Sequence, residues 1–218
     1  MKISGRCMNR FEDIKIYLPK YLSLESQQKL FSDLEQFSNN IISKNFYASD
    51  LYQENSVFQG DGLSNLFIID IQNNNKHISL PSIKIAPGPV MILSNTCDID
   101  PNNQRFIPMR VVYCPIIKLS RYVKVLRKRN TSNEKIDSHL ESMRKQEVTS
   151  IFYLPESNGL KEECMVLLDR INSCDLSFID LNKLQDTRLF SLNNYGFYVF
   201  LFKLSIHISR VREGVDRK

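Results

Sequence analysis

The residues best suited to chemistry lie together in residues 95–105, a polar segment between two apolar runs. Within it, Cys97 stands beside two carboxylates, Asp98 and Asp100, and the segment ends on a cation, Arg105. A cysteine is a nucleophile where a base or a positive environment lowers its pKa, but no histidine lies near Cys97 in the sequence. Asn, Thr and Asp side chains also bond to their own backbone in turns. The alternative to a Cys97-dependent enzyme is therefore a structural turn in which Cys97 packs as a small hydrophobic residue.

A metal site is a further alternative for this segment. Residues 172–176, Asn-Ser-Cys-Asp-Leu, echo residues 95–99, Asn-Thr-Cys-Asp-Ile, and thiolates with carboxylates can bind zinc. The spacing matches no recognised zinc pattern, and the five cysteines form no CxxC pair, so we predict neither a metal site nor a disulfide framework. The sequence also lacks the common phosphate-loop, GxSxG, HExxH and EF-hand patterns, so no cofactor is predicted. Surface or packing roles are assigned to the three histidines, His77, His139 and His207.

Positive charge is concentrated in two segments, residues 118–129 and 203–218, of a chain whose net charge is +5. On a helix over the first segment, the apolar residues fall on one face and Lys124, Arg127 and Lys128 point away from it. Clustered cations gain affinity for nucleic acid by releasing condensed counterions, so these three residues are candidate nucleic-acid ligands. The alternative is the ordinary solvated face of an amphipathic helix.

Apolar runs rich in β-branched residues predict strands at residues 66–71, 90–93, 109–117, 151–154 and 165–168. The turn-forming run Asn73-Asn74-Asn75 predicts a hairpin from residue 66 to residue 85. The runs at 90–93 and 109–117 should form the central hairpin of the protein, with the Cys97 segment as its connection.

Helical spacing of apolar residues predicts helices on either side of, and within, this set of strands. Ser23 can cap an N-terminal helix with one apolar face (Leu30, Phe31, Leu34 and Phe37). This helix either covers an open side of the sheet or acts as a partner or autoinhibitory helix. A second helix in the insertion is marked by Ile136, Leu140 and Met143, and a C-terminal stripe runs from Phe197 to Val211. The stripe fits core packing or a dimer surface.

The chain is predicted to be soluble and cytoplasmic, without membrane contact. No apolar segment typical of a signal peptide follows the N-terminus. The longest apolar run, residues 195–208, is too short for a membrane span and contains Lys203 and His207.

Several segments, in order, resemble the MazF/PemK family of SH3-like barrels. Gly60-Asp61 before the first strand is similar to the family's opening GD, and Pro89–Asn95 to its PVLVLSN strand. Val112–Ile117 resembles the strand that ends in APIT, and Met165–Ile171 resembles SVVLLDQIR. The resemblance covers roughly residue 58 to the C-terminus. It implies a mainly β (α+β) fold: an N-terminal helical extension at residues 1–55, then a barrel at residues 56–218 with a helical insertion at about 118–148 and a C-terminal helix.

The resemblance also implies a function. Members of the family are typically dimeric, metal-independent endoribonucleases of toxin or phage-defence systems, which cut single-stranded RNA by promoting attack of the 2′-OH on its own phosphate. Such chemistry needs a base near the hydroxyl and a cation or donors aimed at the phosphate. The partners implied are single-stranded RNA, a second copy of the chain, and a protein inhibitor from the same operon.

Two family positions differ in this chain. Gly88 stands where the family has an arginine before the Pro-led strand, and Arg110 stands where it has Ser or Thr. Either Asp98 serves as the base of a rearranged site with Arg105 and Arg110 as phosphate ligands, or the protein is a non-catalytic module that binds nucleic acid or protein. The sequence leaves both alternatives open.

Overall fold

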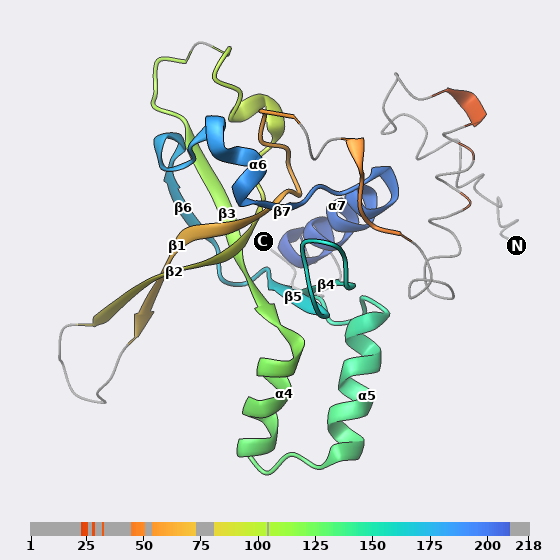
Figure 1. The fold of residues 1–218 in the computed structure, drawn as a ribbon. Coiled ribbons are helices and arrows are strands. Elements are labelled where there is room, and N and C mark those ends of the chain that lie inside the picture. Colours follow the sequence, from red (N-terminus) through yellow and green to blue (C-terminus); the bar gives the residue numbers. More distant parts are fainter. Residues whose placement is uncertain are drawn as a thin grey trace, which may run out of the picture. The chain divides into compact units, whose positions relative to one another are not determined.

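The computed structural model describes residues 23–25, 28, 32, 45–50, 54–72, 81–103 and 105–209 (Figure 1). Contacts divide the chain into two units, Met1–Ile41 and Ile42–Lys218. In the first unit Leu24, Glu25, Gln28 and Ser32 are helical, as the sequence predicts for that segment. The apolar stripe predicted there lies outside the described residues, as does His77. The following paragraphs concern the second unit.

Seven antiparallel strands form one sheet in the order β4-β5-β3-β2-β1-β7, with β6 paired to β3 beside this path. The strands are β1 (Gly62–Gln72), β2 (Ser82–Ile92), β3 (Arg110–Lys118), β4 (Ile151–Leu154), β5 (Cys164–Leu167), β6 (Asn172–Asp175) and β7 (Arg188–Phe190). Four α-helices accompany them among the described residues: α4 (Leu119–Lys128), α5 (Asn133–Arg144), α6 (Leu184–Thr187) and α7 (Asn194–Ser209). The predicted mainly β, α+β fold is confirmed at this level.

The two predicted hairpins are present. β1 and β2 pair from Gly62↔Met91 to Gln72↔Ser82, and β2 continues into β3 with Ile92 opposite Tyr113. Val90, Met91 and Ile92 have no exposed surface, because β2 is covered on both sides where it meets β3. Residues 172–175, whose sequence echoes the Cys97 segment, form β6 along the first half of β3.

The sheet curls so that the backbone of β1 comes within reach of side chains from β3 and β6. The Tyr113 hydroxyl donates to Phe67 O (2.6 Å), and Ile69 N donates to Asn172 Oδ1 (2.7 Å). Burial raises the pKa of Tyr113 to about 12, so this hydroxyl is a neutral donor. No ladder of backbone hydrogen bonds closes the sheet among the described strands, so the SH3-like barrel stays a prediction.

The predicted insertion is confirmed as the hairpin of α4 and α5 between β3 and β4. An apolar cluster joins it to the sheet (Leu119, Met143, Ile151, Tyr153 and Met165). After α5, Gln146 takes a positive φ of 57° and its side chain bonds Tyr153 in both directions, donating to O (2.7 Å) and accepting from N (3.0 Å). One buried amide thus fixes the return of the chain from α5 to β4.

The predicted C-terminal helix is α7, and its described part ends before Val211. Its first half packs in an aromatic cluster, in which Phe46 meets Tyr195 and Phe152 meets Phe200, both at 5.5 Å between ring centroids. A Cβ on Gly196 would lie 2.4 Å from Phe46 O, so only glycine allows this approach. None of the described helices combines the length and apolar character that crossing a membrane requires.

A buried ion pair joins the start of β1 to β7. Arg188 Nε lies 3.1 Å from Asp61 Oδ2, and both side chains are fully buried. Arg188 also donates to Glu54 O (2.7 Å) and to Ser56 O, while Asp61 accepts from Phe58 N (2.9 Å). Burial raises the pKa of Asp61 to about 6, against the opposing effect of Arg188.

This pair should be energetically coupled. Asp61→Asn should lower the free energy of unfolding by about 3–5 kcal/mol near neutral pH, because it leaves the Arg188 guanidinium buried without its counter-charge. The double variant Asp61→Asn/Arg188→Met should lose less than the sum of its two single variants, since neither charge is then left alone. Urea denaturation measures both effects. Asp186→Asn, at an exposed site, is the control, and additive losses would contradict the coupling.

A second buried charge lies on α7. Lys203 is 5% exposed and its ammonium donates to Gln146 O at the end of α5. Burial lowers its pKa from 10.5 to about 8, and the nearby Glu147 only partly offsets this. Between these two pH values the unfolded chain binds more protons at Lys203 than the folded chain does.

Stability conferred through Lys203 should therefore rise between about pH 8 and pH 10.5. In Lys203→Met this rise should be missing, so the wild-type protein should gain up to about 3 kcal/mol relative to the variant across the window. Urea denaturation of both proteins at a series of pH values gives the difference. Lys161→Met, at an exposed lysine, should show no such change, and a flat difference for Lys203→Met would disprove the assignment.

Candidate nucleic-acid interface

The polar segment after β2 folds as the turn that its residue types predict. Asn95 caps the short 3-10 helix Thr96–Asp98 by accepting from Cys97 N (3.0 Å). Asp100 accepts from Asn102 N in the same way (2.9 Å). The expectation that Cys97 packs as a small hydrophobic residue is wrong, because the turn exposes Cys97 and buries the apolar Ile99 to 2% exposure instead.

Asp98 and Arg105, two of the three predicted catalytic residues, lie together in this loop. Arg105 Nη2 is 2.6 Å from Asp98 Oδ1, and the side chains are 42% and 61% exposed. Arg105 also donates to Cys97 O (3.4 Å), which accepts from Asn103 Nδ2 as well (2.7 Å). The loop thus presents a carboxylate and a guanidinium side by side in solvent.

Arg110, the third predicted catalytic residue, is held elsewhere. It begins β3 opposite Asp175 of β6, and its guanidinium donates to Ser173 Oγ (3.0 Å) and Ser173 O (3.2 Å). Within the described part of the chain, no hydrogen bond or ion pair links Arg110 to Asp98 or Arg105. The structure therefore divides the predicted trio into a pair and a separate arginine.

Gly88 lies within β2, opposite Leu66. A Cβ at Gly88 would lie 2.8 Å from Ile68 Cδ1, so the position is closely packed against Ile68. The position that the resemblance assigns to the family's arginine is thus packed against an apolar side chain.

Among the described residues, the two Cys-Asp segments do not converge into a cluster of possible metal ligands. Cys174 lies on β6, paired with Val111, and burial raises its pKa. Over the ranges that the structure describes, no three His, Cys, Asp or Glu side chains converge.

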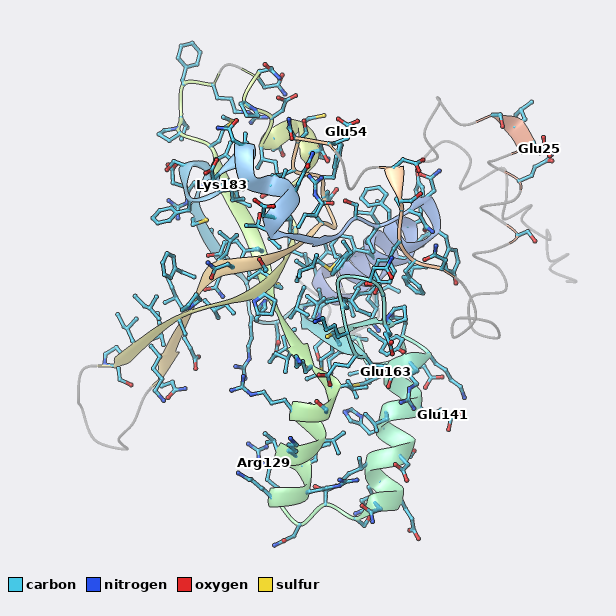
Figure 2. The ribbon with its side chains drawn as sticks, in the orientation of Figure 1. Glu25, Glu54, Arg129, Glu141, Glu163 and Lys183 are labelled. Atoms are coloured by element: carbon cyan, nitrogen blue, oxygen red, sulfur yellow. The ribbon has the colours of Figure 1, made fainter. Side chains whose placement is uncertain are left out.

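The predicted nucleic-acid ligands lie on α4. This helix carries Arg121, Lys124, Arg127 and Lys128 and no acidic residue, and Figure 2 shows Arg129 at its far end. Lys118, just before it, is paired with Glu162 (2.8 Å). Lys124, Arg127 and Lys128 form no ion pair with any residue that the structure describes. The apolar face packs inward through Leu119, so the cations are left toward solvent.

The loop and α4 lie at opposite ends of β3 (Figure 1). Arg110 is the first residue of this strand and Lys118 the last. At about 3.3 Å per residue, the ends are separated by roughly 26 Å. The six predicted residues therefore lie in two groups, one at each end of β3.

A cleft of about 330 Å³ lies where α4 and α5 meet the segment before β5. Its apolar wall is formed by Leu119, Val123 and Leu140, and charged side chains surround it (Lys124, Arg127, Arg144, Glu162 and Glu163). Figure 2 shows Glu163 near the base of the two helices, where Arg144 donates to both of its carboxylate oxygens (2.8 and 2.7 Å). We did not predict this cleft. The sequence indicates it only through two adjacent acidic residues, Glu162 and Glu163, just before a predicted strand.

No protein-family model fits the chain, and no curated protein is significantly similar to it. Function is therefore inferred from the geometry of the described residues.

Proposed function

We propose that the protein binds single-stranded RNA through the basic face of α4, on a barrel of the MazF/PemK kind. The observation that carries this proposal is that Lys124, Arg127 and Lys128 have no ion-pair partner among the described residues. Such cations can bind phosphates without breaking an ion pair to a described residue, and binding releases counterions from the nucleic acid. Of the two alternatives that the sequence leaves open, the non-catalytic binding module is thus our leading proposal.

The proposed barrel is supported by two features. Strands β1, β2 and β3 follow one another as antiparallel neighbours, as the resemblance implies. Tyr113 and Asn172 reach from β3 and β6 to the backbone of β1, which brings the two sides of the curled sheet within side-chain distance.

Two exposed aromatic rings, Phe106 and Phe178, support a single-stranded ligand. Phe106 follows Arg105 and is fully exposed, and Phe178, which stacks edge-on against Phe67 (6.1 Å), is 58% exposed. Unpaired bases stack on such rings, whereas the bases of a duplex are already stacked on each other. Both rings lie toward the Arg110 end of β3, so RNA held by α4 would extend along the strand to reach them.

Binding should depend on the charges of α4. For an RNA of about 12 nucleotides, Lys124→Ala/Lys128→Ala should weaken binding by about tenfold at moderate salt, because two phosphate contacts are lost. The slope of log affinity against log salt should become shallower by about 1.4, at roughly 0.7 per contact. Fluorescence anisotropy over a salt series measures both.

The control removes the same charge elsewhere. Lys84→Ala/Lys183→Ala changes two exposed lysines outside α4, and Figure 2 shows Lys183 at the end of the molecule opposite α4. Equal losses in the two double variants would mean that only net charge matters. Absence of wild-type binding would reject the proposed function.

RNA cleavage is a second candidate, favoured by the exposed Asp98–Arg105 pair. Asp98 could accept the 2′-OH proton as the 2′ oxygen attacks the phosphorus, while Arg105 turns to the phosphate. The P–O5′ bond then breaks to leave a 2′,3′-cyclic phosphate, and the departing 5′ oxygen takes a proton from Asp98 or water, so no metal is needed. Arg110 would then serve as a more distant phosphate ligand, on the other side of the loop.

If this candidate is right, labelled single-stranded RNA should be cut in the presence of EDTA. Asp98→Asn and Arg105→Ala should each reduce the rate by about 100-fold or more. Both should leave the unfolding midpoint nearly unchanged, because exposed ion pairs contribute at most about 1 kcal/mol. Asp180→Asn, which breaks the exposed pair with Lys183 (3.6 Å), is the matched control. Intact RNA with the wild-type protein would leave binding as the function.

A further inference from the structure

The cleft between α4 and α5 has the size and lining of a small binding site. Its volume of about 330 Å³ is at the lower end of the range for ligand pockets, roughly 300–1,000 Å³. Leu119 is buried, and Val123 and Leu140 are half-buried, so the wall offers aliphatic surface to a flat ring. Nucleobases that leave the stack are commonly held against apolar side chains in this way.

The cations at the edge of the cleft suit the phosphates of the same nucleotide. Lys124 and Arg127 line the cleft and belong to the face of α4 that we propose binds RNA. A base directed into the cleft would therefore keep its phosphates beside these two side chains. A ligand with an apolar ring and an anionic backbone fits both parts of the site.

The two glutamates in the cleft differ in the hydrogen bonds that they can still accept. Glu163 accepts two hydrogen bonds from Arg144 and one from the Tyr153 hydroxyl (2.6 Å), out of about four that a carboxylate can accept. Among the described residues, Glu162 is bound by Lys118 and Ser120, and these hydrogen bonds, with the charges of Lys118 and Lys124, keep its pKa below its usual range. Glu162 is thus an ionised acceptor with capacity to spare.

We propose that this cleft is a subsite for one nucleobase, and that Glu162 favours bases that carry an exocyclic amino group over uracil. The inference rests on the proposed RNA binding by α4. A carboxylate accepts from the exocyclic amino group of cytosine, adenine or guanine. Uracil has no exocyclic amino group and presents the acceptor O4 where cytosine presents its amino group, so it offers the carboxylate only its N3–H and places O4 against the negative charge. Cytosine and uracil are the informative comparison, because they have the same ring and differ mainly in this group.

The test is the binding of cytidine-only and uridine-only oligoribonucleotides of about 12 nucleotides, by anisotropy at fixed salt near neutral pH. The wild-type protein should bind the cytidine oligomer about tenfold more tightly, as expected for one charge-assisted hydrogen bond to a base. In Glu162→Gln the preference should fall to about twofold or less, because an amide can both donate and accept.

Glu156→Gln is the matched control. It changes net charge in the same way at an exposed glutamate outside the cleft, and it should keep the wild-type preference. Tight binding of both oligomers without preference would overturn the subsite and leave RNA binding in place. A preference that persists in Glu162→Gln would place base selection elsewhere, and absence of binding to either oligomer would reject both proposals.

Discussion

The arrangement of the sheet depends on the buried ion pair between Asp61 and Arg188. Arg188 comes from β7, near the end of the described chain, and fixes residues 54–61 and the first residues of β1 through one carboxylate and two backbone carbonyls. Apolar packing alone tolerates slippage of short strands, and β7 has only three residues. An ion pair that must be satisfied in a fixed geometry removes that freedom, because any other register leaves a charge buried alone.

With β1 fixed, β3 becomes the axis along which the functional groups are arranged. Backbone pairing with β2 places its middle in the core, and its two ends reach solvent at Arg110 and Lys118. The loop before β3 carries Asp98 and Arg105, and α4 begins directly after its last residue. The length of one strand therefore separates the exposed carboxylate–arginine pair from the basic helix.

The sequence predicts the parts of this arrangement that are local or strongly patterned. The hairpins, the helical insertion and α7 have long apolar runs with a clear period, and Asp98 and Arg105 meet because they share one loop. The strands β6 and β7 were not predicted, because three or four residues with few apolar side chains show no period. The contact of Arg110 with Ser173 joins residues 63 positions apart, so nothing in the local sequence indicates it.

Ion pairs between residues far apart in the sequence also explain why the sequence does not predict the cleft. They explain as well why α4 is the better candidate for binding RNA. Arg144 and Lys118 are neutralised by Glu163 and Glu162, contacts that only the folded chain creates. A count of Lys and Arg residues in the sequence therefore overestimates how many cations at the base of the insertion are free to bind a phosphate. Arg105 is likewise neutralised, because its ion pair with Asp98 must break before Arg105 can bind a phosphate. Lys124, Arg127 and Lys128 have no ion pair to break among the described residues, and only Lys124 is influenced by the charge of the nearby Glu162, so they can bind a phosphate at a lower cost than the paired cations.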